Sequence, residues 1–284
     1  MARNTFTLDG VPLTDSAGRW FPERGTGLRI IPGKRMANIS YPGWDGDAFM
    51  RGATLTPGGV MVKMYVEGND HQDFMQNLEF IIGLFMQRHK LLDLVHHYNV
   101  AGTANRVAKV KFIAGTAPKM ITPTQAIVEF IGEIPDGIWR GDTLITTTVA
   151  TITNNTVYAN VTGFAGSTAP MGDMLIRFEG AFTNVTIGDA GTEDQLFCSV
   201  GLTSSEYLLI DTKLWRAEKF STATWIMGGG VPVELSITSS RGFGPWFMLH
   251  PVMDSGILTY RMRTRSTSPS SSPIVEIRNY KEYL

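Results

Sequence analysis

Residues 69–87 (NDHQDFMQNLEFIIGLFMQ) constrain the fold more than any other segment, because no other part of the sequence has a sustained helical period. The apolar positions that would share one helix face are Phe74, Leu78, Ile81 or Ile82, and Phe85. Asn69 or Asp70 can cap the first turn, and Gln72 or Asp73 stands where a capping box needs its second polar residue. An isolated helix of this length is marginal in water, so we expect the apolar face to pack on a sheet.

The segments on either side of this helix have the pattern of short strands separated by turn residues. Residues 5–13 predict a hairpin around the tight-turn pair Asp9-Gly10. Further strands, in which apolar and polar residues alternate, are expected at residues 27–31, 59–68, 92–98, 105–114 and 125–134. Residues 1–135 are therefore predicted to form a small α+β domain with about seven strands and one packed helix.

Beyond a hinge at residues 134–137 (IPDG), the chain is predicted to be all-β. Strands are expected at residues 143–153, 155–161, 174–179, 184–187, 195–200, 206–211, 214–220, 223–227, 232–238, 246–250, 257–265 and 274–280. Their spacing predicts a β-sandwich domain over residues 136–284, so the fold class is mainly β. The pattern leaves open whether the last strand, residues 274–280, stays in this domain or returns to the first.

The composition excludes several classes of protein. With 43% hydrophobic and 18% charged residues, the 284-residue chain is expected to be globular and large enough for two domains. A formal net charge of −1 supplies no basic field that would hold a nucleic-acid backbone, so we expect no sequence-specific nucleic-acid partner. The start MARNTFTLDG lacks the apolar region of a signal peptide, and no apolar run has the length of a membrane span. We expect a soluble protein, made in the cytoplasm and not inserted into a membrane.

No group of side chains indicates an enzyme, so we expect no catalytic residue, no metal and no cofactor. Lone Cys198 excludes an intrachain disulfide and is expected to be buried in a strand. The histidines, which show no HExxH spacing, are His71, His89, His96, His97 and His250. The glycine-rich segments lack the lysine of a P-loop and the full GxGxxG pattern. Asp93, Glu129 and Glu133 would serve glycoside cleavage only if the fold paired them, and solvated strand faces are the simpler interpretation.

The tryptophans are the side chains best suited to recognition. They are Trp20, Trp44, Trp139, Trp215, Trp225 and Trp246. Exposed aromatic rings on a β-sandwich can stack on sugar rings or act as interface hot spots, although core packing is the commoner role. Within the predicted sandwich, the candidates for glycan stacking are Trp215, Trp225 and Trp246.

Several segments, taken in order, resemble the distal tail and minor tail proteins of long-tailed phages. The opening hairpin TFTLDGVPL is similar to the start of that family, as is IPGKRM followed by the strand GVMVKMYVEG and a single helix. Residues 166–187 (GSTAPMGDMLIRFEGAFTNVTI) resemble the opening of the family's C-terminal sandwich. The strand EYLLID with Thr212, and the close IVEIRNYKEYL, are similar to later strands of that domain. The resemblance covers nearly the whole chain, but the loop lengths between residues 211 and 232 depart from the family pattern.

The resemblance implies a structural virion protein at the phage tail tip that acts by assembly. In this family an N-terminal domain forms a ring, usually a hexamer, and a galectin-like or carbohydrate-module-like sandwich projects from it. The implied partners are other copies of the chain, the major tail tube protein, tail-tip or tail-associated proteins and the tape measure protein. DNA passes through the lumen of such a ring without being read, which is consistent with the near-neutral charge.

A ring of this kind needs an interface that closes on rotation, and unpaired strand edges and loops are suited to it. Our candidates for an arm that packs on the next subunit are Tyr41, Trp44 and Phe49, in the glycine-rich residues 39–49. The same rings can instead fold back on their own core. The alternative function is a carbohydrate-binding module that recognises a host-surface glycan, and a glycan-cleaving hydrolase ranks third.

Overall fold

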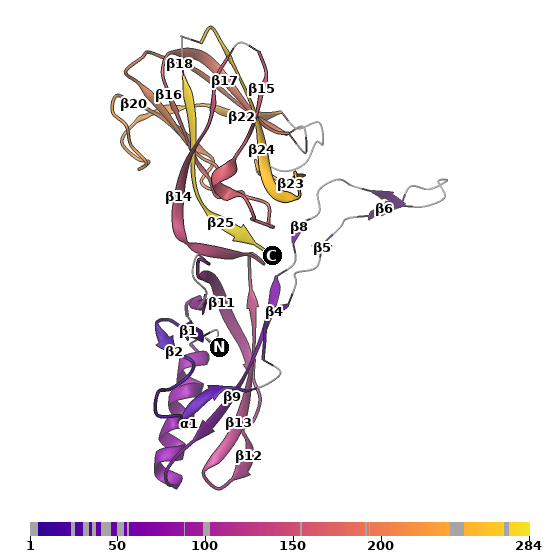
Figure 1. Cartoon of the computed structure of the whole chain (residues 1–284), viewed down its shortest axis with the longest axis vertical. Coiled ribbons are helices and arrows are strands. Elements are labelled where there is room, and N and C mark those ends of the chain that lie inside the picture. The colour runs from indigo at the N-terminus through magenta and orange to yellow at the C-terminus, as the bar shows by residue number, and fades with distance from the viewer. Residues whose placement is uncertain are drawn as a thin grey trace. The chain divides into compact units, whose positions relative to one another are not determined.

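The computed structural model describes residues 5–23, 26–30, 34–35, 38–40, 47–49, 54–55, 57–87, 89–98, 103–153, 155–190, 192, 194–238, 247–269 and 273–284. These residues form a mainly-β structure with one packed helix, α1 (His71–Phe85), which confirms the predicted fold class. The chain divides into two compact units (Figure 1): unit 1 is Met1–Asp142 with Leu284, and unit 2 is Thr143–Tyr283. The predicted hinge, residues 134–137, is a tight turn in which the Gly137 amide donates to the Ile134 carbonyl.

The strands of unit 1 are short at the start of the chain and long around the helix. They are β1 (Thr5–Leu8), β2 (Val11–Pro12), β3 (Trp20–Pro22), β4 (Gly27–Ile30), β5 (Lys34–Arg35), β6 (Asn38–Ser40), β7 (Asp47–Phe49), β8 (Thr54–Leu55), β9 (Gly58–Glu67), β10 (Leu92–His97), β11 (Arg106–Gly115), β12 (Lys119–Thr122) and β13 (Gln125–Ile134). β14 (Trp139–Thr151) starts in this unit, where it pairs with β11. The predicted hairpin at residues 5–13 is confirmed, with Asp9 and Gly10 both at positive φ.

The sheet of unit 1 is built on three antiparallel pairings among its long strands. β9 pairs with β13 along its whole length, from Gly58 opposite Ile134 to Glu67 opposite Gln125. β11 pairs with β10 through its first half and with β13 through its second half, with a bulge beyond Phe112. Every second residue of β9 is buried, as expected for a sheet that is covered on one face.

Helix α1 covers this buried face. Its buried apolar side chains are Phe74, Leu78, Ile81, Leu84 and Phe85, which confirms the face predicted from the helical period. The Phe85 ring lies parallel to Phe130 of β13, with the ring centroids 4.2 Å apart, and meets Phe112 of β11 edge-on at 4.8 Å. Such aromatic pairs add to the free energy gained by burying their surface.

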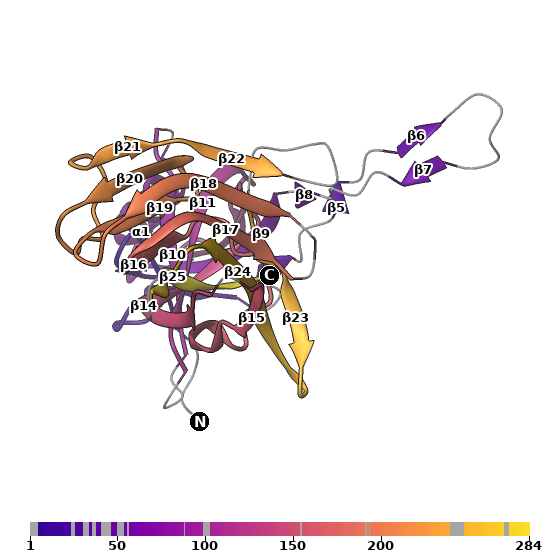
Figure 2. The same cartoon turned by 90° about the horizontal axis from the view of Figure 1, so that it is seen from above.

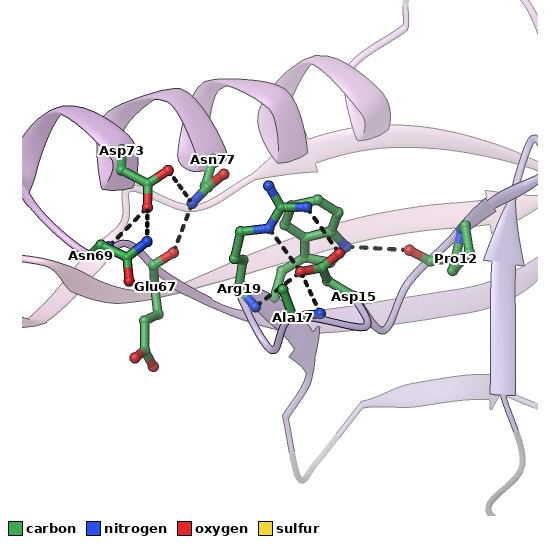
Figure 3. Close-up of polar contacts among 9 residues, drawn as sticks. Pro12, Asp15, Ala17, Arg19, Glu67, Asn69, Asp73 and Asn77 are labelled. Atoms are coloured by element: carbon green, nitrogen blue, oxygen red, sulfur yellow. Dashed lines mark hydrogen bonds and ion pairs between the residues drawn. The ribbon is translucent and has the colours of Figure 1, made fainter.

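The start of α1 is capped as the sequence predicts. The Asp70 carboxylate accepts from the Asp73 amide at 2.8 Å. The Asp73 carboxylate in turn accepts from the Asn69 amide at 2.9 Å (Figure 3). Asn77, one turn further on, is buried and donates to the Glu67 carbonyl at the end of β9. These reciprocal bonds satisfy amides that the first helical turn leaves without partners, and they join the helix to the strand before it.

Unit 2 is a β-sandwich. It contains the 3-10 helix η1 (Thr162–Phe164) and the strands β15 (Val157–Asn160), β16 (Leu175–Glu179), β17 (Phe182–Asp189), β18 (Gln195–Leu202), β19 (Tyr207–Asp211), β20 (Arg216–Phe220), β21 (Val231–Val233), β22 (Leu235–Thr238), β23 (Pro251–Asp254), β24 (Ile257–Thr267) and β25 (Ile274–Tyr283). One sheet has the order β25-β16-β19-β20-β21, and the other has the order β15-β24-β17-β18-β22 with β23 on β24. The inward residues of both sheets share one apolar core, which includes Cys198, Phe178 and Tyr260.

The structure corrects the sequence-based strands of unit 2 in three places. Residues 223–227, predicted as a strand, form a loop between β20 and β21. β23 was not predicted, and in unit 1 neither was β12. Within residues 246–250 the described part forms one isolated bridge, Leu249 with Met171, instead of a strand. The last strand pairs with β16 in unit 2, with Ile277 opposite Ile176.

We expect Phe85→Ala to destabilise the protein by about 3–5 kcal/mol, because it empties the centre of the contact between helix and sheet. The matched control is Phe80→Ala on the same helix, where the side chain is 46% exposed against 0% for Phe85. Phe80 touches only the Trp20 ring among the described aromatic rings, at 5.3 Å, so its loss should cost about 1 kcal/mol or less. Urea unfolding followed by circular dichroism measures both values. Equal losses for the two variants would contradict this account of the core.

Candidate functional site

The described residues of the predicted interface arm, 39–40 and 47–49, lie in short paired strands of unit 1 (Figure 2). We use "the ribbon" for the paired strands β5 with β8 and β6 with β7. Lys34 and Arg35 lie opposite Leu55 and Thr54, and further along the ribbon Asn38 lies opposite Phe49. The backbone of Phe49 therefore belongs to β7, while Tyr41 and Trp44 lie outside the described residues.

Unit 1 also leaves large apolar side chains exposed on β11, β12 and β13. All four residues of β12 are exposed, among them Met120 and Ile121. Ile113 on β11 and Ile131 on β13 are exposed as well. β12 pairs with β13, and no second partner of β12 occurs among the described strands. Its free edge and these side chains are suited to contact with another chain.

In unit 2, the outer face of the sheet β25-β16-β19-β20 carries a row of three charged side chains and one leucine. Across the strands, Glu276 lies opposite Arg177, Arg177 opposite Leu209, and Leu209 opposite Glu218. The Arg177 guanidinium donates twice to the Glu276 carboxylate, at 2.5 and 3.0 Å. Leu209 is fully buried although it points away from the sandwich core, so something must cover this face.

The cover is the loop of residues 221–230 between β20 and β21. Trp225, at its middle, is half-buried, with its ring centroid 4.5 Å from the Arg177 guanidinium carbon and 5.6 Å from that of Arg278. Cation–π contacts of this kind hold the indole against the sheet. Trp225 is therefore engaged within its own unit, and its proposed role in glycan stacking stays a prediction.

The loop is tied down at its end by a buried carboxylate, Glu218. Its Oε2 accepts from three successive backbone amides, those of Gly228, Gly229 and Gly230, at 2.8, 3.2 and 3.0 Å. Its Oε1 forms an ion pair with Arg216. Burial by itself raises the pKa of Glu218, but the three amides and the Arg216 guanidinium outweigh this effect and lower the pKa below its usual value. The run of three glycines matches no phosphate-binding motif, and no pattern in the sequence marks Glu218 as its partner.

The other two glycan candidates lie elsewhere. Trp215 sits in the turn between β19 and β20 at a φ of 55° and packs against the core of unit 2. Trp246 lies outside the described residues. Trp215 and Trp225 therefore lie on different loops, and the stacking role of the three tryptophans stays a prediction.

Four of the five histidines have separate local partners. His71 contacts the Pro123 carbonyl, and His97 contacts the Thr7 hydroxyl, both at 3.2 Å. His96 stacks on Phe6, and His250 lies 3.1 Å from the carboxylate of buried Asp189. Among the described residues, no group of three or more histidine, cysteine, aspartate or glutamate side chains is placed to hold a metal ion.

The remaining sequence candidates are accounted for locally. Cys198 is buried, as predicted, and burial raises the pKa of its thiol to about 12. Glu129 forms an ion pair with Lys63 at 2.7 Å, and Asp93 forms one with Lys109 at 2.5 Å. Within the part of the chain that the structure describes, no helix combines the length and apolarity needed to cross a membrane.

We expect Gly230→Ala to destabilise unit 2 by about 1–3 kcal/mol, because a Cβ at Gly230 would lie 2.6 Å from the Lys219 carbonyl oxygen and 2.9 Å from the Phe220 ring. Gly229→Ala is the matched control, since it keeps the amide that binds Glu218 and its Cβ would meet no atom within 4 Å. Thermal unfolding compares the two. A Gly229→Ala variant as unstable as Gly230→Ala would show that the loop tolerates no side chain at all, for reasons other than this packing.

The Glu218 carboxylate should make stability depend on pH. A carboxyl whose pKa is lower in the folded state than in the unfolded state stabilises the fold above the unfolded value, here 4.5, and loses this contribution as the pH falls through the folded value. We therefore expect Glu218→Gln to be less stable than the parent at pH 7, with the difference shrinking below about pH 4. Urea unfolding at pH 7 and below about pH 4 measures the difference in the free energy of unfolding. The control is Glu234→Gln, which changes an exposed glutamate beside β21. A difference that does not change with pH would contradict the role of the charge.

Comparison with known proteins gives an informative match among solved structures. No family model and no curated protein matches the sequence. Among solved structures, the Dit protein (gp 19.1) of phage SPP1, described as a paradigm of the hub adsorption apparatus in phages that infect Gram-positive bacteria, matches with a TM-score of 0.59 and 14% identity over 100% of both chains.

Two further matches are weaker. The baseplate of phage P2 in its activated conformation gives a TM-score of 0.37 with 11% identity over 98% of each chain. A fructofuranosidase from Schwanniomyces occidentalis gives 0.21 with 7% identity, over 87% of this chain and 60% of that one. Both scores are too low to show a shared fold. The chain thus has the fold of the SPP1 Dit protein from end to end, which confirms at the level of fold the resemblance to phage distal tail proteins.

Proposed function

We propose that this protein is a distal tail protein of a long-tailed phage, which serves as a hub at the tip of the tail. The observation that carries the proposal is the match of fold with the SPP1 Dit protein over the full length of both chains. The ordered sequence resemblance supports the same function independently. In this proposal the protein acts by assembly in the virion and catalyses no reaction.

The finer proposal is a ring at the end of the tail tube. Copies of unit 1 form a closed ring, a hexamer, whose lumen lets DNA pass without reading its sequence. The ring contacts the major tail tube protein on one side, and tail-tip or tail-associated proteins and the tape measure protein on the other. A closed ring needs a heterologous interface, in which two different surfaces of each copy meet.

The ribbon is our candidate for one of these two surfaces. A two-stranded hairpin on its own is marginally stable in water, so a ribbon of four short strands gains most by packing against another chain. The aromatic candidates Tyr41, Trp44 and Phe49 lie in this segment, where they would supply the buried anchors of the contact.

The exposed end of the unit 1 sheet is our candidate for a second contact surface. β12 offers an unpaired edge and exposes Met120 and Ile121, while Ile113 and Ile131 expose further apolar area on the adjoining strands β11 and β13. An added strand from a neighbour would satisfy the edge amides and cover these side chains. The mass of the purified chain distinguishes the two possible neighbours, because only another copy of the chain can form an oligomer in isolation.

We expect the purified chain to form an oligomer of ring size, and the double variant Trp44→Ala/Phe49→Ala to lose most of that mass because the anchors of the arm are removed. Light scattering after size exclusion gives the mass, and negative-stain imaging shows whether the rings are closed. The matched control is Tyr158→Ala/Tyr280→Ala, which removes two exposed rings from unit 2.

Thermal unfolding of both double variants separates loss of assembly from loss of folding. A parent that remains a monomer would overturn the ring. A Trp44→Ala/Phe49→Ala variant that keeps the full oligomer mass would leave the hub in place and remove these residues from its interface.

A further inference from the structure

One end of the sheet β15-β24-β17 in unit 2 holds a cleft of about 400 Å³. Its walls come from three strands that Figure 2 shows side by side: β15, β24 and β23. The residues that line it are Tyr158, Asn160, Ala190, Val252, Met253, Asp254 and Arg261. None of these residues was singled out by the sequence, and none is a tryptophan.

The polar groups of this cleft converge from different strands. The Asn160 amide donates to the Asp254 carboxylate, at 2.5 Å, across the gap between β15 and β23. The Arg261 guanidinium lies over the Tyr158 ring, with its central carbon 5.2 Å from the ring centroid. A carboxylate, a carboxamide and a guanidinium therefore border one hollow together with an aromatic ring.

The cleft is open although its apolar parts are large. The Tyr158 residue is 50% exposed, and Met253 is 68% exposed. The sandwich core is closed by other residues, including Tyr260 and Met262, which alternate with Arg261 along β24 and are fully buried. The fold of unit 2 therefore does not require the exposed Tyr158 ring and the Met253 thioether beside the three polar groups.

The wall of the cleft is fixed in place by a buried contact. Asp189, at the end of β17 and next to Ala190, is fully buried. Its carboxylate lies 3.1 Å from the His250 ring nitrogen and 3.4 Å from the His250 backbone amide, just before β23. This contact ties the start of β23 to β17, so the cleft is formed before any ligand arrives, and binding would cost little ordering of the chain.

We propose that this cleft binds a saccharide through its vicinal hydroxyl groups. Hydroxyl groups can donate to the Asp254 carboxylate and accept from the Asn160 amide and the Arg261 guanidinium, which is the complementary set for a pair of neighbouring hydroxyls. The apolar C–H face of a sugar ring packs on the exposed part of Tyr158 and on Met253. The volume lies within the range of small-molecule sites and suits a short saccharide.

A sugar site in this cleft places glycan recognition at the β15-β24-β23 end of unit 2 and away from the tryptophans. It deepens the alternative function and goes beyond the hub role, because a sugar site in unit 2 requires no ring. It also replaces the tryptophans as the binding surface. Trp225 lies against two guanidinium groups, those of Arg177 and Arg278, and Trp215 packs on the core. Tyr158 contacts one guanidinium, that of Arg261, and half of the residue stays exposed.

The test uses the full chain and a panel of free sugars: glucose, galactose, N-acetylglucosamine and rhamnose, with disaccharides of each. Saturation-transfer NMR detects contact, and titration gives the affinity up to the millimolar range. We expect at least one sugar to bind saturably, and Tyr158→Ala and Asp254→Asn each to weaken it at least tenfold. Tyr280→Ala, which removes an exposed tyrosine outside the cleft, should leave the affinity unchanged.

Thermal unfolding shows that each variant is folded. Light scattering of the same samples gives the oligomer mass separately. Failure of the sugar proposal is therefore distinguished from failure of the proposed hub function. The proposal is overturned if no sugar in the panel binds. It is also overturned if binding survives both cleft variants. Binding of polyphosphate alone, weakened by salt and unaffected by Tyr158→Ala, would likewise overturn it, because that result assigns the Arg261 surface to an anionic polymer.

Discussion

Packing of a single helix on one face of a sheet determines which strand edges and side chains of unit 1 stay exposed. Phe85 stacks on Phe130 and meets Phe112 edge-on, so the helix binds β11 and β13 together from the same side. The alternation of β13 places the remaining side chains on the other side, where Ile131 is exposed. A core with one covered face stabilises the unit while leaving strand edges and apolar side chains for contacts between chains. The proposed ring depends on this asymmetry.

The sequence predicts those parts of the fold whose signal is local and long. The helix has four turns of apolar period and a capping pair, Asp70 with Asp73, and the structure contains both. β9 and β13 alternate over ten residues each, and their positions were predicted to within one residue. Strands of two to four residues, such as β5 and β12, contain too few alternations to be distinguished from turns, so the prediction of about seven strands in this domain was too low.

The features missed by sequence reasoning depend on contacts between distant segments. The three glycines 228–230 match no motif in the sequence. Only the fold shows that Glu218, ten residues before the first of them, accepts from all three amides. Asn160 and Asp254 meet only because β15 and β23 both pair with β24. Neither contact is marked in the sequence by a periodic pattern or a motif. The aromatic residue type predicted a binding role for Trp225 instead, whose ring packs on Arg177.

The two sheets of unit 2 therefore differ in what they offer a partner. The outer face of β25-β16-β19-β20 is occupied by its own loop, which a buried carboxylate and two cation–π contacts hold in place. A ligand there would first have to displace Trp225 and leave the charge of Glu218 buried without its amides, which is costly. At the end of the other sheet, the polar groups around Tyr158 are already in position and border open space. Recognition by unit 2 is thus favoured at the β15-β24-β23 end and disfavoured on the face that carries the tryptophan.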